Sequence, residues 1–335
     1  MIYDSYFLLI SGIVVVALIF DFWNGMNDAA NSVATIVSTK VLKPFHAVLW
    51  AAFWNFAAAF GFGVAVANTI GKGIINPEIV TEYLILAALM GAISWVVVAT
   101  RLGIPISVSH SLIGGLLGAG FAKGGFAAIL LSGKVQIVLL FIFLAPIIGA
   151  VSAFFFHSVV LNLVKNMPQS QMNYWFRKLQ LVSAASYSLG HGTNDAQKTM
   201  GIIAVLLFSA GYLGNEFYIP VWVILVAHTA IALGTLAGGW KVINTMGMKI
   251  TKLHPIHGFS AESSAAITLL GTATFGIPVS TTHVIAGSIM GVGTTNRLSA
   301  VRWGLVRKIV LTWLVTIPIS SVVAYLSYQL LMMIV

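Results

Sequence analysis

Residues 24–32 read NGMNDAANS and residues 191–199 read HGTNDAQKT, so one Gly-x-Asn-Asp-Ala pattern occurs twice in the chain. Both copies lie within or beside long apolar stretches. A carboxylate at the centre of a membrane helix costs about 2.5–3.5 kcal/mol on insertion scales. Because the chain accepts this cost twice with the same neighbours, we expect Asp28 and Asp195 to have partners that offset it.

The composition is typical of a helical membrane protein. Hydrophobic residues make up 59% of the 335 residues and charged residues 7%, whereas a soluble domain has about a quarter charged residues. Several apolar stretches exceed the ~20 residues that cross a bilayer as a helix; they are 6–24, 45–67, 80–100, 135–163, 201–214, 216–239 and 305–335. The short alternating segments of an outer-membrane barrel are absent from the sequence. We therefore expect an all-α polytopic membrane protein.

Charge and cysteine content exclude several other classes of protein. The net charge of +9 comes from Lys and Arg placed between the apolar segments, as in loops at the cytoplasmic face, so we expect membrane lipid and no nucleic acid as a partner. The chain has no cysteine and therefore no disulfide or thiolate metal site. No basic residue precedes the first apolar stretch and no small-residue cleavage site follows it, so we expect a mature helix there.

Three motifs recur in the same order, which predicts two related halves. The pairs are GMNDA at 25–29 with GTNDA at 192–196, VANTIG at 66–71 with VINTMG at 242–247, and GIPISVSH at 103–110 with GIPVSTTH at 276–283. We place the first half at 1–165 and the second at 179–335, joined by a short cytoplasmic connector at 166–178.

The orientation of the halves follows from counting crossings. We count 6–38, interrupted near Asn24–Asp28, then 45–67 and 135–163 as crossings, and 80–122 as a hairpin that GIPIS breaks near mid-depth. An odd number of crossings inverts the second half. With the N-terminus outside, most basic residues fall inside; these are Lys40, Lys43, Lys165, Arg177, Lys178, Lys241, Lys249, Lys252, Arg297, Arg302, Arg307 and Lys308, against Lys72, Lys123 and Lys134 outside.

We therefore expect two inverted-topology repeats with broken helices and two re-entrant helical hairpins. The protein would lie in the cell inner (cytoplasmic) membrane with both termini outside. Corresponding helix breaks in inverted halves are typical of a transporter's binding site near the bilayer midplane.

The Gly-x-Asn-Asp motifs favour a site for a small hard cation. Glycine loosens a helix, and an unwound turn frees backbone carbonyls that join Asn and Asp oxygens as ligands. A single motif of this kind could have a purely structural role, in which the Asp caps a helix break or pairs with Lys198. Two motifs at matching positions favour the cation site over this structural role. The candidate sodium ligands are Asn24, Asn27, Asp28, Asn194, Asp195, Gln197, Ser107 and Ser280.

The GIPxS motifs favour an anion site. Proline ends the incoming helix, and Ser or Thr begins the next one. A helix N-terminus offers free N–H groups and a positive dipole end. Plain capping explains one hairpin equally well, whereas two facing tips suit a tetrahedral oxyanion. The candidate anion ligands are Ser107, Val108, Ser109, Ser111, Ser280, Thr281, Thr282, Asp28, Asp195, Asn31 and Lys198. His110 and His283, which follow the hydroxyl clusters, are packing residues or proton carriers.

The paired NDA motifs and paired GIPxS hairpins resemble the inorganic phosphate transporter (PiT) family over essentially the whole chain. The resemblance implies secondary active uptake of inorganic phosphate, coupled to Na⁺ in many members and to H⁺ in others. Some bacterial members are thought to carry metal–phosphate complexes and others sulfate. The second motif departs from the first at Gln197-Lys198, where the first half has Ala30-Asn31.

We therefore expect a phosphate importer that uses Na⁺ as the coupling ion, with no other cofactor and no catalytic residue, and with a homodimer as one assembly. The alternatives within the fold are a proton-coupled or metal–phosphate carrier, or a sulfate permease. An intramembrane Ser/His enzyme is a different class, and the sequence lacks the Gly-x-Ser-x-Gly elbow that would favour it. Uphill accumulation would separate a carrier from a passive channel.

Overall fold

The computed structural model describes residues 5–61, 63–73, 79–129 and 133–334, and these residues are almost entirely helical. The all-α prediction is confirmed. The α-helices are α1 (Ser5–Ser38), α2 (Pro44–Ala57), α3 (Ala65–Gly73), α4 (Glu82–Leu102), α5 (Val108–Gly124), α6 (Gly133–Val164), α7 (Gln169–Ser209), α8 (Val221–Ala237), α9 (Trp240–Lys249), α10 (Pro255–Thr274), α11 (Thr281–Asn296) and α12 (Trp303–Ile334). Short 3₁₀ turns are η1 (Ala58–Phe60), η3 (Gly125–Ala128) and η4 (Leu298–Ala300).

The order of elements repeats where the sequence motifs repeat. Each half has a long first helix (α1, α7), two shorter helices (α2 and α3, α8 and α9), a helical hairpin (α4–α5, α10–α11) and a long last helix (α6, α12). The halves interleave, because α12 packs on α4 and α5 while α6 packs on α10 and α11. Of the predicted connector 166–178, the part from Gln169 onward belongs to α7.

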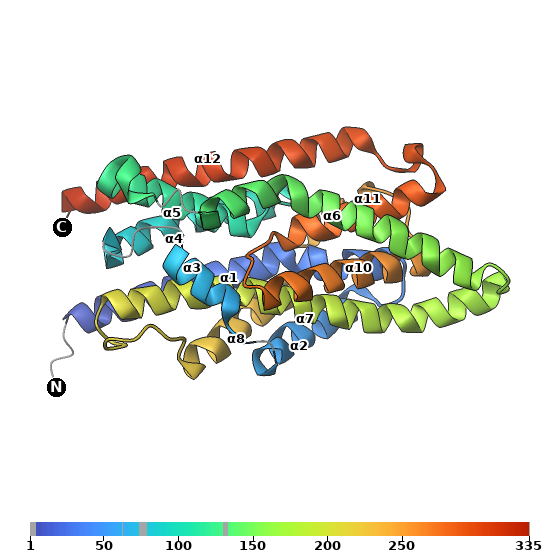
Figure 1. Cartoon of the computed structure of the whole chain (residues 1–335), viewed down its shortest axis with the longest axis horizontal. Helices are drawn as coiled ribbons and strands as arrows, with labels where there is room; N and C mark the ends of the chain where they lie inside the picture. Colours follow the sequence, from blue (N-terminus) through green and yellow to red (C-terminus); the bar gives the residue numbers. More distant parts are fainter. Residues whose placement is uncertain (1–4, 62, 74–78, 130–132, 335) are drawn as a thin grey trace.

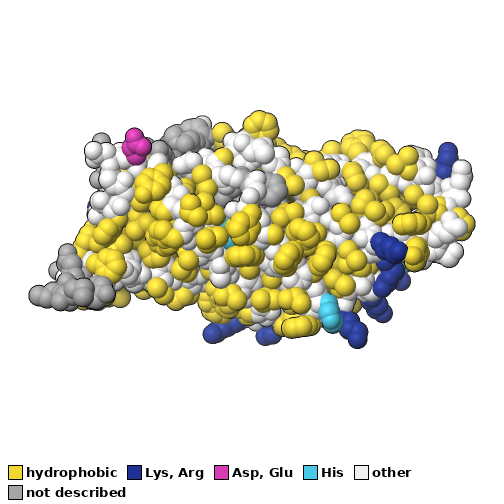
Figure 2. Space-filling model, turned by 90° about the horizontal axis from the view of Figure 1, so that it is seen from below, with side chains coloured by type: hydrophobic (Ala, Val, Ile, Leu, Met, Phe, Trp, Pro, Cys, Tyr) yellow, Lys and Arg dark blue, Asp and Glu magenta, His cyan; other side chains and the backbone are white. Residues whose placement is uncertain are grey.

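The surface is apolar and the interior is rich in polar side chains. Hydrophobic side chains cover most of the face in Figure 2, and Lys and Arg gather mainly toward the end opposite the N-terminus. In the described residues, five helices are long and apolar enough to cross a membrane, and up to seven spans result if each of two bent helix pairs is one span. Exposed Phe53 and buried Asn55, on the same helix, illustrate this arrangement.

The predicted helix breaks at the two Asn-Asp motifs are wrong. The first motif lies inside the continuous helix α1 and the second inside the continuous helix α7. The glycines serve close packing instead of unwinding. A Cβ on Gly25 would lie 2.1 Å from the Ile231 carbonyl oxygen, and one on Gly192 would lie 2.6 Å from the Asn55 carbonyl oxygen. Each motif glycine therefore lets another helix approach its own.

The bends occur one element later in each half. The segment containing α2 and η1 meets α3 at 82°, and α8 meets α9 at 71°. At the second bend Gly238 has φ +67°, which favours glycine, and a Cβ on Gly239 would lie 2.5 Å from the Met26 carbonyl oxygen. The bends thus place irregular backbone against α1 and α7.

The two hairpins reach the middle of the molecule from opposite ends (Figure 1). The hairpin α4–α5 comes from the end where both chain termini lie, and α10–α11 comes from the other end. Two hairpins that enter from opposite ends are what an inverted repeat requires. That residues 80–122 enter and leave the membrane on the same side stays a prediction. Residues 1–4 and 335, to which the prediction of outside termini refers, lie outside the described residues.

Candidate functional site

The GIPxS motifs build two matching hairpin tips. Helix α4 ends at Leu102 and is followed by Gly103, whose φ of +73° is the left-handed conformation that glycine adopts readily. Gly276, with φ +65°, follows the incoming arm of the other hairpin. The next helix is then capped by serine: Ser107 Oγ accepts from the His110 N–H at 3.2 Å, and Ser280 Oγ accepts from the His283 N–H at 3.3 Å. Ser107 and Ser280 are therefore N-caps of α5 and α11.

The two tips touch each other at the centre of the protein. Thr282 Oγ1 lies 2.9 Å from the Ile106 carbonyl oxygen, to which it donates across the two hairpins. The rings of His110 and His283 lie edge to face with centroids 4.8 Å apart. Two helix N-termini, α5 and α11, therefore converge on one buried region.

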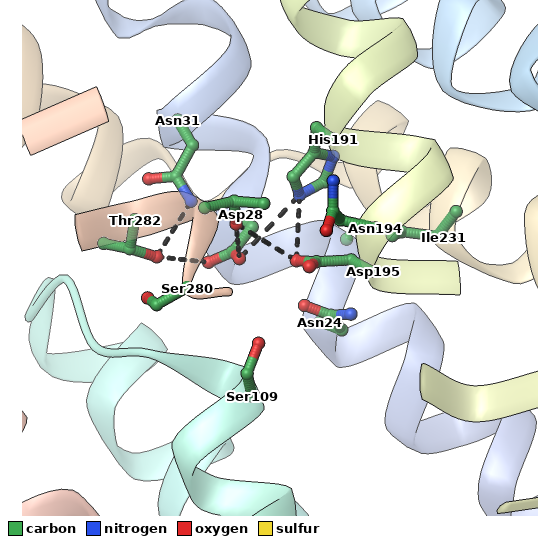
Figure 3. A network of polar contacts seen from close by, with 12 residues as sticks. Asn24, Asp28, Asn31, Ser109, His191, Asn194, Asp195, Ile231, Ser280 and Thr282 are labelled. Carbon is green, nitrogen blue, oxygen red and sulfur yellow. Dashed lines mark hydrogen bonds and ion pairs between the residues drawn. The ribbon is translucent and has the colours of Figure 1, made fainter. Parts of the chain in front are cut away.

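The two motif carboxylates lie at this junction (Figure 3). Thr281 Oγ1 is 3.2 Å from Asp28 Oδ2 and 3.2 Å from Asp195 Oδ2, so a single hydroxyl stands between them. Thr282 Oγ1 is 3.3 Å from Asp28 Oδ1. Both carboxylates are buried, which makes charge compensation at this point essential.

His191 belongs to the site, although it was not among the predicted ligands. Its Nε2 lies 3.3 Å from Asp195 Oδ2 and 3.8 Å from Asp28 Oδ2. Its Nδ1 lies 3.1 Å from Asn55 Oδ1, an oxygen that only accepts, so Nδ1 donates. Nε2 is then free to hold a second proton or to bind a cation beside the carboxylates. Its position four residues before Asp195 was the available signal.

Lys198 provides a fixed positive charge within the site. Its buried Nζ donates to Asp195 Oδ1, to Ser109 Oγ and to the Val279 carbonyl oxygen, the last at 3.0 Å. A lysine ammonium has three hydrogens, and these three oxygens use all of them.

The motif asparagines tie each long helix to the hairpin of its own half. Asn27 Nδ2 donates to Thr100 Oγ1 at 2.8 Å, and Asn194 Nδ2 donates to the Leu269 carbonyl at 2.9 Å. Within the described part of the chain, the Oδ1 atoms of Asn24, Asn27 and Asn194 are buried and accept no hydrogen bond. Buried acceptors without donors are suited to a cation.

The structure gathers most of the predicted ligands, but not all. Around the two carboxylates lie Asn31, Ser109, Lys198, Thr281 and Thr282. Gln197 points elsewhere, because its Oε1 accepts from the Val66 and Ala67 N–H groups at 2.8 and 3.2 Å at the start of α3. Ser111 bonds back to the Ser107 carbonyl at 3.4 Å, and Val108 is a buried first residue of α5.

A second buried acidic network, centred on Glu262, lies between α1, α7 and α10. The Glu262 carboxylate accepts from Thr35, Ser183 and Gln180, the last at 3.0 Å. These three donors satisfy the buried carboxylate and link α10 to α1 and α7.

The chemistry of the site is that of ion binding. Asp28, His191 and Asp195 each offer a ligand atom within 4.8 Å of the others, which is close enough to hold one cation. Hydroxyl groups and two helix N-termini surround the same point, so anion donors and cation acceptors lie side by side. The site therefore suits an anion together with a cation.

Comparisons with known proteins agree with this chemistry. The chain is 56% identical to a probable low-affinity inorganic phosphate transporter of Rhizobium meliloti, with 96% of each chain covered. It is 45% identical to a protein of the same description from Bacillus subtilis, covering 96% of this chain and 97% of that one.

A solved structure described as the sodium-dependent phosphate transporter superposes with a TM-score of 0.87 at 27% identity, covering 98% of this chain and 100% of the other. The match to the phosphate transporter family spans residues 24–172 and 162–324, which include both Asn-Asp motifs and both hairpins. The chain is a multi-pass membrane protein that belongs to the phosphate transporter family.

Proposed function

We propose that this protein imports inorganic phosphate by secondary active symport with Na⁺. The main support for this proposal is that two buried carboxylates, Asp28 and Asp195, lie directly against the two converging hairpin tips. Relatives described as inorganic phosphate transporters, and the solved sodium-dependent phosphate transporter, support the choice of ions.

The anion would lie between the tips of α4–α5 and α10–α11. Their first helical turns supply free N–H groups, and the hydroxyls of Ser109, Thr281 and Thr282 surround the same point. A tetrahedral phosphate presents four oxygens, so donors arriving from two sides can bind it on two faces.

The cations would lie beside the motifs of the continuous helices α1 and α7. Carboxylate oxygens of Asp28 and Asp195 and the unpartnered amide oxygens of Asn24, Asn27 and Asn194 are hard ligands, which Na⁺ prefers. The prediction of cation ligands from unwound backbone at these motifs is abandoned, because the helices are unbroken there.

Coupling follows from charge. Phosphate cannot approach two buried carboxylates unless a cation or proton compensates them, and Na⁺ bound beside Asp28 and Asp195 supplies this compensation. Each ion therefore raises the affinity of the other, which is the reciprocity that symport requires.

The test is uptake of radiolabelled phosphate into proteoliposomes, with a Na⁺ gradient and a pH gradient imposed separately. Uphill uptake with inward Na⁺ alone, unaffected by excess sulfate, is the expected result. Uptake driven by the pH gradient alone would assign Asp28, Asp195 and His191 to proton transfer and reject Na⁺ coupling. Competition by sulfate would point to a sulfate permease.

A further inference from the structure

We propose that the Lys198 ammonium is a covalently tethered substitute for one coupling cation, so that this chain takes up one Na⁺ fewer than its two matching motifs would hold. The proposal rests on the proposed Na⁺ symport and replaces the role of Lys198 as a phosphate ligand.

The three oxygens around Lys198 are those of a cation cage. Its Nζ contacts a carboxylate (Asp195), a hydroxyl (Ser109) and a backbone carbonyl (Val279). This set of hard oxygens, drawn from α7 and from both hairpin tips, is the kind that Na⁺ prefers. Since all three ammonium hydrogens are used by the protein, none is left for phosphate.

The first motif faces the same three kinds of oxygen at the equivalent positions, two from its own half and one, Thr282 Oγ1, from the second half. By the motif alignment, Asp195 corresponds to Asp28, Ser109 to Thr282, and Val279 to Ile106. In the structure, Thr282 Oγ1 lies 3.3 Å from Asp28 Oδ1 and 2.9 Å from the Ile106 carbonyl oxygen. The two cages are thus built alike from corresponding atoms.

The two cages differ at the residue one turn beyond the aspartate. The equivalent of Lys198 is Asn31, whose neutral Nδ2 donates to Thr282 Oγ1 at 2.9 Å and brings no charge. In formal charges, Asp28 and Asp195 contribute two negative charges, and Lys198 neutralises one of them. The first cage is left for a mobile cation, whereas the second is permanently filled.

The decisive experiment counts sodium ions. Equilibrium binding of radioactive Na⁺ to the purified full-length protein, and the Na⁺-to-phosphate flux ratio in proteoliposomes, are measured for wild type and three variants. Lys198→Asn makes the second cage like the first, Asn31→Lys makes the first like the second, and Lys178→Asn is the same substitution at an exposed position of α7.

We expect Lys198→Asn to bind one Na⁺ more per chain than wild type and to raise the flux ratio by one ion, with a steeper dependence of uptake on Na⁺. Asn31→Lys should bind one Na⁺ fewer, which tests the proposal independently if Lys198→Asn does not fold. Lys178→Asn should match wild type.

An unchanged Na⁺ count in a folded Lys198→Asn protein, or in a folded Asn31→Lys protein, would overturn the proposal. Failure of the proposed function looks different: wild-type uptake would then not follow the Na⁺ gradient. The binding comparison still decides in that case, because a gained Na⁺ in Lys198→Asn supports the tethered cation and an unchanged count rejects it.

Discussion

The helices α1 and α7 carry the same Gly-x-Asn-Asp motif in the same surroundings, yet the side chains on either side of the motif differ in kind. The first motif is flanked on the site-facing side by the neutral amides Asn24 and Asn31, and the second by His191 and Lys198 at the equivalent positions. The packing of the two helices is repeated and the charge is not. In the proposed arrangement the first motif holds a mobile cation, whereas the second carries the Lys198 ammonium beside Asp195.

The largest expected effect concerns the two aspartates. Asp195→Asn removes the carboxylate that Lys198 contacts and leaves a buried ammonium without its counter-charge, which should lower the free energy of unfolding by about 3–5 kcal/mol. Asp28→Asn should destabilise the protein less, because among the described residues Asp28 contacts hydroxyls and His191 but no ammonium. Thermal unfolding of both variants in detergent measures the difference.

The double variant Asp195→Asn with Lys198→Met is the control. Removing both charges together should recover much of the stability lost in Asp195→Asn, since no uncompensated ion remains. Equal destabilisation by Asp28→Asn and Asp195→Asn would show that the two halves do not differ in the way proposed.

The second prediction tests what the motif glycine does. Gly25→Val on α1 must push against the Ile231 backbone of α8, and overpacking of this kind costs about 1–3 kcal/mol. A Cβ on Gly12, in the same helix, would meet nothing within 4 Å, so Gly12→Val should cost far less. If the two variants unfolded at the same temperature, close packing would not be the reason for the glycine.

Features of the fold that depend on residues close together in the sequence could be predicted, and features that depend on a distant helix could not. The ends of the hairpin helices were predictable, because Gly103 and Pro105 stop one helix and Ser107 begins the next by chemistry within a few residues. The predicted interruption at the Asn-Asp motifs failed for the opposite reason. Whether Gly25 loosens a helix or admits a neighbour depends on Ile231, which is far away in the chain.

The site was predictable to the same extent. Repetition of the motifs identified Asp28, Asp195 and the hairpin hydroxyls, which do lie together. The contact of His191 with Asp28 on α1 and the use of Gln197 at the start of α3 depend on which helices pack against α7. The list of ligands predicted from the sequence therefore included Gln197 and omitted His191.

A third prediction concerns anion choice and compares the aspartates again. Monohydrogen phosphate carries an O–H group that sulfate lacks, and Asp28 is the carboxylate not contacted by the ammonium. Asp28→Asn should therefore weaken the preference for phosphate over sulfate by about 1–3 kcal/mol, the cost of leaving a buried hydrogen-bonding group unpaired. Competition of sulfate against labelled phosphate uptake measures it. A fall in uptake with unchanged selectivity would remove Asp28 as the discriminating group.

The smallest effect is expected from exchanging the hydroxyls that the two cages share. Thr282→Ser keeps an Oγ beside Asp28 Oδ1 and the Ile106 carbonyl, and it gives the first cage the residue that Ser109 provides in the second. Only a methyl group is lost, so unfolding and phosphate uptake should stay close to wild type. Thr282→Val has nearly the same volume but no hydroxyl, and it leaves Asn31 Nδ2 without its acceptor, which costs about 1–3 kcal/mol. If both variants transported equally well, the hydroxyl would not be a ligand, and the likeness of the two cages would be one of shape alone.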